Sequence, residues 1–271
     1  MRRCTPRDRP GRGLGECVRG SVGLLVLAGA LAIGAGALWL GVRFEDDARR
    51  ALDASGYPWH TDVVAATFWI GEEFDPDAPD GSQMISTYDS DWYESYGGCD
   101  GVVRDGVCGT EERYAEDGYW PTNMTPRQNP FYLDLPYDDV HDERGFMWRG
   151  DVIPWADDPE YAQHLHDPGF SLMKGRWVEI RHAWRTCYGQ IADAGPAEYH
   201  DAAYVFGRDD ARPATSEFNG AGMDVSPALN ACLDLEGLED LVSRVDWRFV
   251  EAEDVSDGPW SILVNDDPWV R

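Results

Sequence analysis

The stretch Cys187-Tyr-Gly-Gln-Ile-Ala-Asp193-Ala-Gly-Pro196 is followed by Gly222-Met-Asp224-Val-Ser226-Pro227 and then by Asp246-Trp-Arg-Phe-Val250. In the first two segments, apolar residues run into a turn, and an aspartate stands at the junction. An acid at the end of a strand lies half exposed at the rim of a sheet, where ligand-contacting groups are commonly placed. Asp193 and Asp224 are therefore the first candidate site residues.

Around these segments, short strand patterns alternate with long turn-rich excursions. We expect strands near residues 63–70, 129–136, 177–184, 187–192, 202–206 and 245–249, with long insertions over 72–128 and 137–175. Ser226-Pro227 predicts the start of a short helix, because serine caps free N–H groups and proline fits the first turn. This helix turns Leu229 and Leu233 inward. The pattern predicts a mainly β domain that closes into a small barrel of six strands.

The N-terminal part predicts a membrane anchor. Residues 21–42 form an uncharged run of 22 residues, long enough as a helix to cross a bilayer core of roughly 30 Å. Residues 1–20 carry six arginines against two acids, a charge of +4, so this tail is expected in the cytoplasm. A cleaved signal peptide is the alternative, because Ala35-Gly36-Ala37 has the form of a cleavage site. Either way, residues 43–61 form an exported stalk and 62–271 the extracytoplasmic domain.

The charge balance excludes one class of partner. The whole chain carries −27, so removing the +4 of the tail leaves −31 on residues 21–271. Such a surface repels a phosphate backbone, and we expect no nucleic-acid partner. Lys174 is the single lysine. The acidic, lysine-poor composition suits a salt-exposed habitat, or equally reflects codon usage and solubility.

Four cysteines, Cys99, Cys108, Cys187 and Cys232, fall in the exported part, where disulfides persist. Four cysteines allow three pairings. The local choice joins Cys99 to Cys108, closing a small loop, and Cys187 to Cys232, tying a strand to the later helix. Zinc is the alternative for such a set, but no Cys-x-x-Cys spacing is present. We therefore expect neither a metal nor a cofactor.

Over residues 177–250 the chain resembles the double-psi β-barrel family shared by expansins and rare lipoprotein A. Asp193-Ala-Gly-Pro196 matches the Asp-x-Gly-Pro turn of rare lipoprotein A, and Met223-Asp224-Val-Ser226 matches its Ile-Asp-Leu-Ser. The expansin pattern of Leu-Asp-Leu-Ser-Pro, a helix and Trp-Arg-Val-Val is matched by residues 223–227, the helix and Trp247-Arg-Phe-Val250. The glutamate, aspartate and histidine that transglycosylases of this family hold between their first two strands have no match in residues 72–128.

The resemblance implies a shallow glycan groove that contains Asp193 and Asp224. It favours a barrel that binds or loosens a cell-envelope polysaccharide, peptidoglycan or another glycan, as expansins do. The alternatives are a lytic transglycosylase or glycoside hydrolase with Asp224 as the acid, and a structural or interaction domain whose groove the insertions have closed. Exposure of both acids in an aromatic cleft favours the first two functions. Burial of both against backbone N–H groups favours the third.

Three further residues are candidates for substrate binding. Thr67 belongs to Ala66-Thr67-Phe68, which is similar to the Ala-Thr-Tyr of the first expansin strand. Trp69 and Tyr188 are candidates for stacking on sugar rings. Large aromatic side chains also supply much of the burial in a small barrel, so a core or loop-anchoring role is the competing interpretation. The same two interpretations apply to Trp92, Tyr93 and Trp120.

Overall fold

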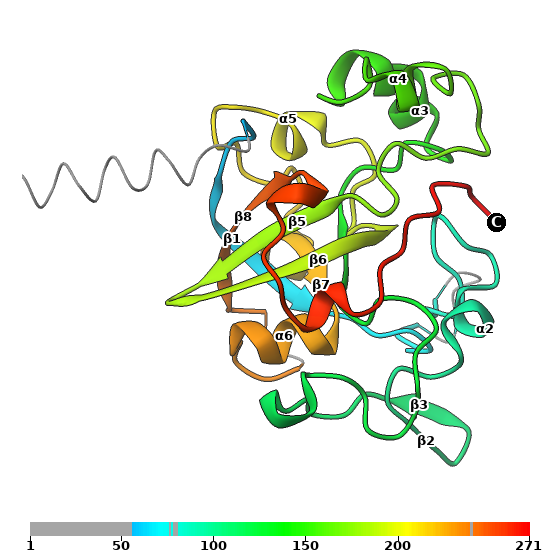
Figure 1. Cartoon of the computed structure of the whole chain (residues 1–271), viewed down its shortest axis with the longest axis vertical. Helices are drawn as coiled ribbons and strands as arrows, with labels where there is room; N and C mark the ends of the chain where they lie inside the picture. Colours follow the sequence, from blue (N-terminus) through cyan, green and yellow to red (C-terminus); the bar gives the residue numbers. More distant parts are fainter. Residues whose placement is uncertain (1–55, 76, 78–80, 239–240) are drawn as a thin grey trace, which may run out of the picture. The chain divides into compact units, whose positions relative to one another are not determined.

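Six strands close into a mixed barrel in the order β1-β7-β4-β6-β5-β8 (Figure 1). They are β1 (His60–Thr67), β4 (Tyr132–Leu135), β5 (Trp177–His182), β6 (Arg185–Ala194), β7 (Ala221–Val225) and β8 (Arg244–Val250). The β1–β7 and β4–β6 pairs are parallel, whereas the other four neighbouring pairs are antiparallel. The prediction of a mainly β, closed, six-stranded barrel is therefore confirmed.

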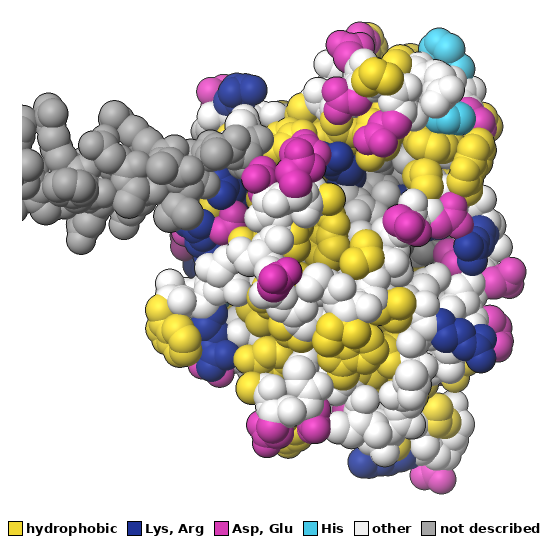
Figure 2. Space-filling model, in the orientation of Figure 1, with side chains coloured by type: hydrophobic (Ala, Val, Ile, Leu, Met, Phe, Trp, Pro, Cys, Tyr) yellow, Lys and Arg dark blue, Asp and Glu magenta, His cyan; other side chains and the backbone are white. Residues whose placement is uncertain are grey.

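The computed structural model describes residues 56–75, 77, 81–238 and 241–271. The predicted tail (1–20), membrane anchor (21–42) and all but the last six residues of the stalk (43–61) lie outside these ranges. Within the described ranges, no helix has the length and apolar character needed to span a bilayer. On the visible face of the molecule, acidic side chains are scattered around larger apolar patches (Figure 2).

One predicted strand is wrong. Residues 202–206 lie mostly in a short helix, α5 (Ala202–Val205), whose start is capped because the side chain of Asp201 accepts a hydrogen bond from Tyr204 N. Tyr204 is fully buried, and its hydroxyl donates to Gly222 O and accepts from Trp247 Nε1. The sixth strand is instead β7, which contains Asp224. An apolar run of four or five residues fits either structure, and here the cap decides.

The predicted helix after β7 is present as α6 (Pro227–Leu233). Ser226 Oγ accepts a hydrogen bond from Leu229 N, and both Leu229 and Leu233 are fully buried, as expected. The remaining elements lie mainly in the insertions and near the C-terminus: α2 (Trp92–Tyr96), β2 (Val102–Arg104), β3 (Val107–Gly109), η1 (Ala115–Asp117), α3 (Glu143–Val152), α4 (Pro159–Ala162), η2 (Glu217–Asn219), η3 (Ala252–Asp254) and η4 (Pro259–Ser261).

Both predicted disulfides are present. Cys99 is bonded to Cys108 across the β2–β3 hairpin, and Cys187 on β6 is bonded to Cys232 on α6. The first bridge therefore closes a small loop within the 72–128 insertion. The second fixes the helix against the barrel wall. Each bridge contributes on the order of 2–4 kcal/mol, chiefly by restricting the unfolded chain.

The second insertion, residues 137–175, is organised around Arg149 on α3. This side chain is fully buried and forms an ion pair with Asp139 at 3.4 Å. Its guanidinium also donates to five backbone carbonyls, those of Asp139, His164, Leu165, Asp167 and Phe170. Asp139 in turn accepts from Ser171 Oγ and Leu172 N, each at 2.6 Å. A single charged pair thus ties helix α3 to the irregular chain on both sides of it.

His60 is a buried base at the start of β1. Its ring stacks on Trp247 at 4.1 Å between centroids and meets Tyr204 edge-on. Neither ring nitrogen has a hydrogen-bond partner. Burial lowers the pKa of His60 to about 4. The folded protein therefore holds a neutral imidazole at neutral pH.

The burial of His60 predicts that the free energy of unfolding depends on pH. Between pH 6.5 and 4, His60 is protonated in the unfolded chain but stays neutral in the folded chain. The free energy of unfolding therefore falls as the pH is lowered. The loss amounts to about 3 kcal/mol. His60→Phe keeps a stacking ring without a titrating group. We expect the unfolding free energy of this variant, measured with urea, to exceed that of the wild type progressively below pH 6.5. His141→Gln, at an exposed position, is the control. A constant difference between His60→Phe and the wild type across this range would contradict the prediction.

Candidate functional site

Three aspartates lie side by side on neighbouring strands of the barrel. Asp134 on β4 is the register partner of Asp224 on β7 and also of Asp193 on β6. Asp224 N donates a hydrogen bond to Asp134 Oδ1 at 2.9 Å. We call these three residues the aspartate row. The structure therefore brings the two predicted acids together and adds a third between them.

Asp134 is the buried centre of the row. It is only 4% exposed, and burial raises its pKa well above the usual range, with further increases from the charges of Asp224 and Asp193. Gly195 lies close against it, since a Cβ atom at that position would stand 2.9 Å from Asp134 Oδ2. The Asp193-Ala-Gly-Pro turn thus needs its glycine to pass the carboxyl group. Burial and the two neighbouring charges therefore favour the protonated form of Asp134.

Asp193 is held by the backbone. Its Oδ1 accepts hydrogen bonds from Thr87 N at 2.7 Å and Ala194 N at 2.8 Å, and the residue is 6% exposed. Burial raises its pKa to about 6, although the two N–H groups favour the ionised form. Thr87 belongs to the first insertion, so Asp193 fastens that insertion to β6. Of the two predicted acids, this one has the environment of a structural residue.

Asp224 has a different environment. The residue is half-buried, but its Oδ1 is buried and has no hydrogen-bond partner. Burial raises its pKa to about 7, and the nearby charges of Glu72 and Asp193 raise it as well. A carboxyl group that titrates near neutrality and has an unpartnered oxygen is suited to giving or taking a proton. Asp224 is therefore the strongest candidate in the row for chemistry.

Glu72 is a functional candidate that the sequence analysis did not identify. It follows β1 at the start of the first insertion, and its Oε2 accepts from Trp69 N at 3.4 Å. Its charge is the largest single influence on Asp224 after burial. Nothing local in the sequence marks it, because it is one of many acids in an acidic insertion. Only the folded chain places it near Asp224.

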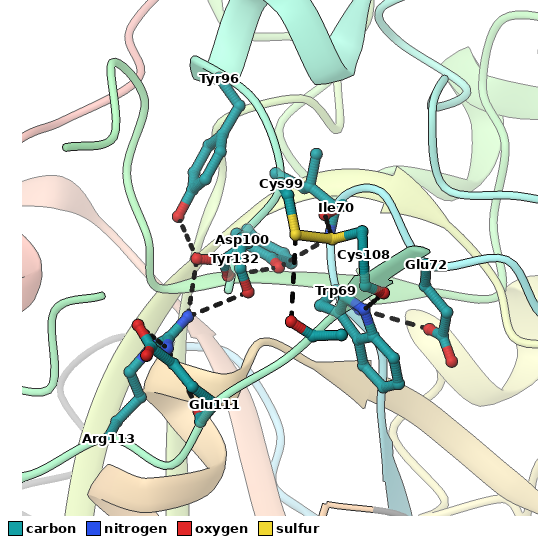
Figure 3. Close-up of a disulfide and its surroundings, with 11 residues drawn as sticks. Trp69, Ile70, Glu72, Tyr96, Cys99, Asp100, Cys108, Glu111, Arg113 and Tyr132 are labelled. Carbon is teal, nitrogen blue, oxygen red and sulfur yellow. Dashed lines mark hydrogen bonds and ion pairs between the residues drawn. A yellow bond between two sulfur atoms is a disulfide. The ribbon is translucent and has the colours of Figure 1, made fainter. Parts of the chain in front are cut away.

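The first insertion is fastened to the barrel close to the row by a buried polar network (Figure 3). Tyr132, two residues before Asp134, accepts from Ile70 N and donates to Asp100 Oδ2. Asp100 Oδ1 also accepts from Tyr96 and from Arg113, with which it forms a buried ion pair at 2.8 Å. Because Asp100 adjoins Cys99, the disulfide and this network together hold the chain that carries Glu72.

The predicted binding residues are placed differently from one another. Trp69 is half-buried, donates from Nε1 to Cys108 O, and lies beside Glu72 (Figure 3). Thr67 ends β1, and its Oγ1 accepts from Asn230 Nδ2 on α6 at 2.8 Å. Tyr188 is buried in the main core against Trp260, and its hydroxyl pairs with Ser256 Oγ at 3.3 Å. Trp69 is thus the predicted aromatic that accompanies the site, and Tyr188 is a core residue.

The raised pKa of Asp193 predicts a stability effect. The folded chain keeps this carboxyl protonated up to about pH 6, whereas the unfolded chain ionises near 3.8, so stability falls as the pH rises through this window. The change is about 3 kcal/mol. Asp193→Asn retains an acceptor oxygen but does not titrate. We expect its unfolding free energy, relative to the wild type, to rise between pH 4 and 6 and then stay level. Asp105→Asn, on an exposed turn, is the control; parallel curves for wild type and Asp193→Asn would refute the assignment.

The site is therefore a row of three acids on adjacent strands, with a fourth acid influencing Asp224. Within the described residues, no group of three or more His, Cys, Asp or Glu side chains has the arrangement of a metal site. A family model that matches the chain was not found, and no curated protein or solved structure matches it at the significance required.

Proposed function

We propose that this protein cleaves a cell-envelope polysaccharide, with Asp224 as the proton donor. The observation that carries the proposal is the buried, unpartnered Oδ1 of Asp224, on a carboxyl group whose pKa is raised to about 7. A general acid needs a proton that is still bound at the working pH. Asp224 holds such a proton near neutrality, whereas Oδ1 of Asp193 is engaged by two backbone N–H groups.

The fold supports a double-psi barrel. The closed order of six strands, with parallel β1–β7 and β4–β6 pairs, is compatible with that topology. The motifs that resemble expansins and rare lipoprotein A fall on β6, β7, α6 and β8, and two of them carry row aspartates. Two disulfides favour an oxidising compartment. Together with the uncharged run 21–42, they support a single-pass anchor and an extracytoplasmic barrel.

The proposed reaction breaks one glycosidic bond. Asp224 gives its proton to the bridging oxygen as the bond from that oxygen to the anomeric carbon breaks, and the leaving sugar departs as an alcohol. The anomeric carbon takes up oxygen from water, or from a hydroxyl of its own sugar in a lytic transglycosylase. That oxygen loses its proton to the Asp224 carboxylate, which restores the acid. Burial and the charges of Glu72 and Asp193 keep the pKa of Asp224 high.

A second candidate is a barrel that binds or loosens the polysaccharide without cleaving it. The environment of Asp193 favours this function, because its carboxylate is buried against two backbone N–H groups and fixes the insertion rather than facing a ligand. One acid of the pair thus meets the expectation for a structural residue, and the other does not. An assay for released glycan fragments distinguishes cleavage from binding alone.

The test uses the full-length chain purified in a mild detergent. It is incubated with purified peptidoglycan and with other microbial and plant glycans, and soluble fragments are measured by reducing-end assay and mass spectrometry. Mass spectrometry distinguishes a hydrolysed reducing end from the anhydro end of a lytic transglycosylase. We expect time-dependent release from at least one polymer. Retention of the protein on an insoluble polymer without any release would favour the binding function and overturn the proposed cleavage.

A further inference from the structure

A second candidate site lies in a cavity of about 210 Å³ beside the aspartate row. Its lining includes Asp89, Trp92, Arg127, Lys174, Ala192 and Arg271. The turn that contributes Ser86 and Asp89 also contains Thr87, whose N–H group donates to Asp193. Ala192 directly precedes Asp193 on β6. The cavity and the row therefore share two segments of chain.

The cavity gathers basic side chains in a strongly acidic protein. The only lysine of the chain, Lys174, lines it together with two arginines. Lys174 Nζ donates to Trp269 O at 2.6 Å, and Arg271 pairs with Asp267 at 2.7 Å. The exposed Arg127 guanidinium has no hydrogen bond or ion pair with any described residue. An unpaired guanidinium that lines a cavity is suited to a carboxylate, which it binds through two parallel hydrogen bonds.

The same cavity holds an unsatisfied acceptor. Asp89 is 2% exposed; its Oδ1 accepts from Asp91 N at 3.0 Å, but its Oδ2 is buried without a partner. A buried carboxylate oxygen without a hydrogen bond costs free energy that a ligand N–H group recovers. The exposed Asp266 also lines the cavity and adds negative charge. The lining therefore has a place for an anion and a place for an N–H donor.

We propose that this cavity binds a carboxylate that has an N–H group close to it, as in an acylated amino acid or the end of a short peptide. Arg127 and Lys174 bind the carboxylate, and Asp89 Oδ2 accepts the N–H group. Such a ligand is either a free small molecule or a side group of a polymer. If the proposed cleavage at the row is correct, the cavity selects polysaccharides whose side groups carry this chemistry.

The binding test uses N-acetyl-L-alanine as the probe and the full-length chain, monitored by ligand-observed NMR and calorimetry. We expect saturable binding that weakens about tenfold or more in Arg127→Gln and in Asp89→Asn, because each change removes a charge-assisted hydrogen bond. N-acetyl-L-alaninamide, which lacks the carboxylate, and acetate, which lacks the N–H group, should each bind more weakly. Arg104→Gln on the exposed β2 strand is the matched control. Absence of saturable binding, or equal binding by all variants, overturns the proposal.

A second arm identifies the source of the ligand. Insoluble peptidoglycan and the same polymer stripped of its peptides are compared for retention of wild type and Arg127→Gln. Stronger wild-type retention on the intact polymer, lost in Arg127→Gln, assigns the cavity to a polymer side group. Equal retention on both polymers, with the probe still bound, assigns it to a free ligand. Binding of the probe does not depend on cleavage. The binding result can therefore be interpreted even if the proposed enzymatic function fails its own test.

Discussion

Asp224→Asn is expected to reduce the release of glycan fragments by about 10²–10⁴-fold, the usual contribution of a general acid. Asparagine has nearly the same shape as aspartate but has no proton to transfer. The substitution breaks no side-chain hydrogen bond at Oδ1, because that atom has none, and the bond from Asp224 N to Asp134 is made by the backbone. The variant should therefore fold and bind polymer normally.

The control for this variant is Asp105→Asn, which removes an acid from the exposed β2–β3 turn. Initial rates of fragment release and urea unfolding curves are compared for the three proteins. The wild-type rate should also fall as the pH rises above about 7, because Asp224 loses the proton it must donate. Release by Asp224→Asn within threefold of the wild type would exclude Asp224 as the acid.

Arg149→Ala is expected to lower the free energy of unfolding by about 3–5 kcal/mol, the range for breaking a buried ion pair. The substitution leaves the carboxylate of Asp139 buried without its countercharge, and it leaves carbonyl oxygens of four further residues without their donor. Most single-domain proteins are stable by only about 5–15 kcal/mol. This one change should therefore remove a large part of the stability.

Arg144→Ala on the same helix is the matched control, because Arg144 is exposed. Its loss should change the free energy of unfolding by less than about 0.5 kcal/mol. Both variants are measured by urea denaturation at one pH, with tryptophan fluorescence as the probe. A loss below about 1 kcal/mol for Arg149→Ala would mean that water replaces the guanidinium and that the 137–175 insertion does not depend on it.

Local patterns in the sequence predicted much of the barrel. The alternation at Trp177–His182, the Ser226-Pro227 helix start and the pairing of nearby cysteines each depend on a few adjacent residues, and the structure agrees with all three. Residues 202–206 were mistaken for a strand because five apolar residues in a row have no distinct period. The helix there is decided by one side chain, that of Asp201.

Such local patterns did not predict the centre of the site, Asp134. Asp134 lies in a short apolar strand, and its neighbours in the row come from strands much later in the sequence. A buried acid in the motif Tyr-Leu-Asp-Leu was the one available signal, because burying a charge without a purpose is costly. Glu72 carried no signal at all, since its neighbourhood is rich in acids. Long-range strand pairing sets the neighbours of Asp134, and the path of the chain after β1 brings Glu72 near Asp224. Neither follows from a local sequence pattern.

The strand order β7-β4-β6 has a consequence for the time at which the aspartate row forms. Asp134 and Asp224 are separated by 90 residues, so their contact forms only after a large loop closes, and loop closure of this kind is slow. In the unfolded chain, every row acid is an ordinary solvated carboxylate that is ionised at neutral pH. A chain still emerging or still unfolded therefore lacks an acid catalyst. Under the proposed function, the closed barrel is therefore the form of the chain that carries the acid.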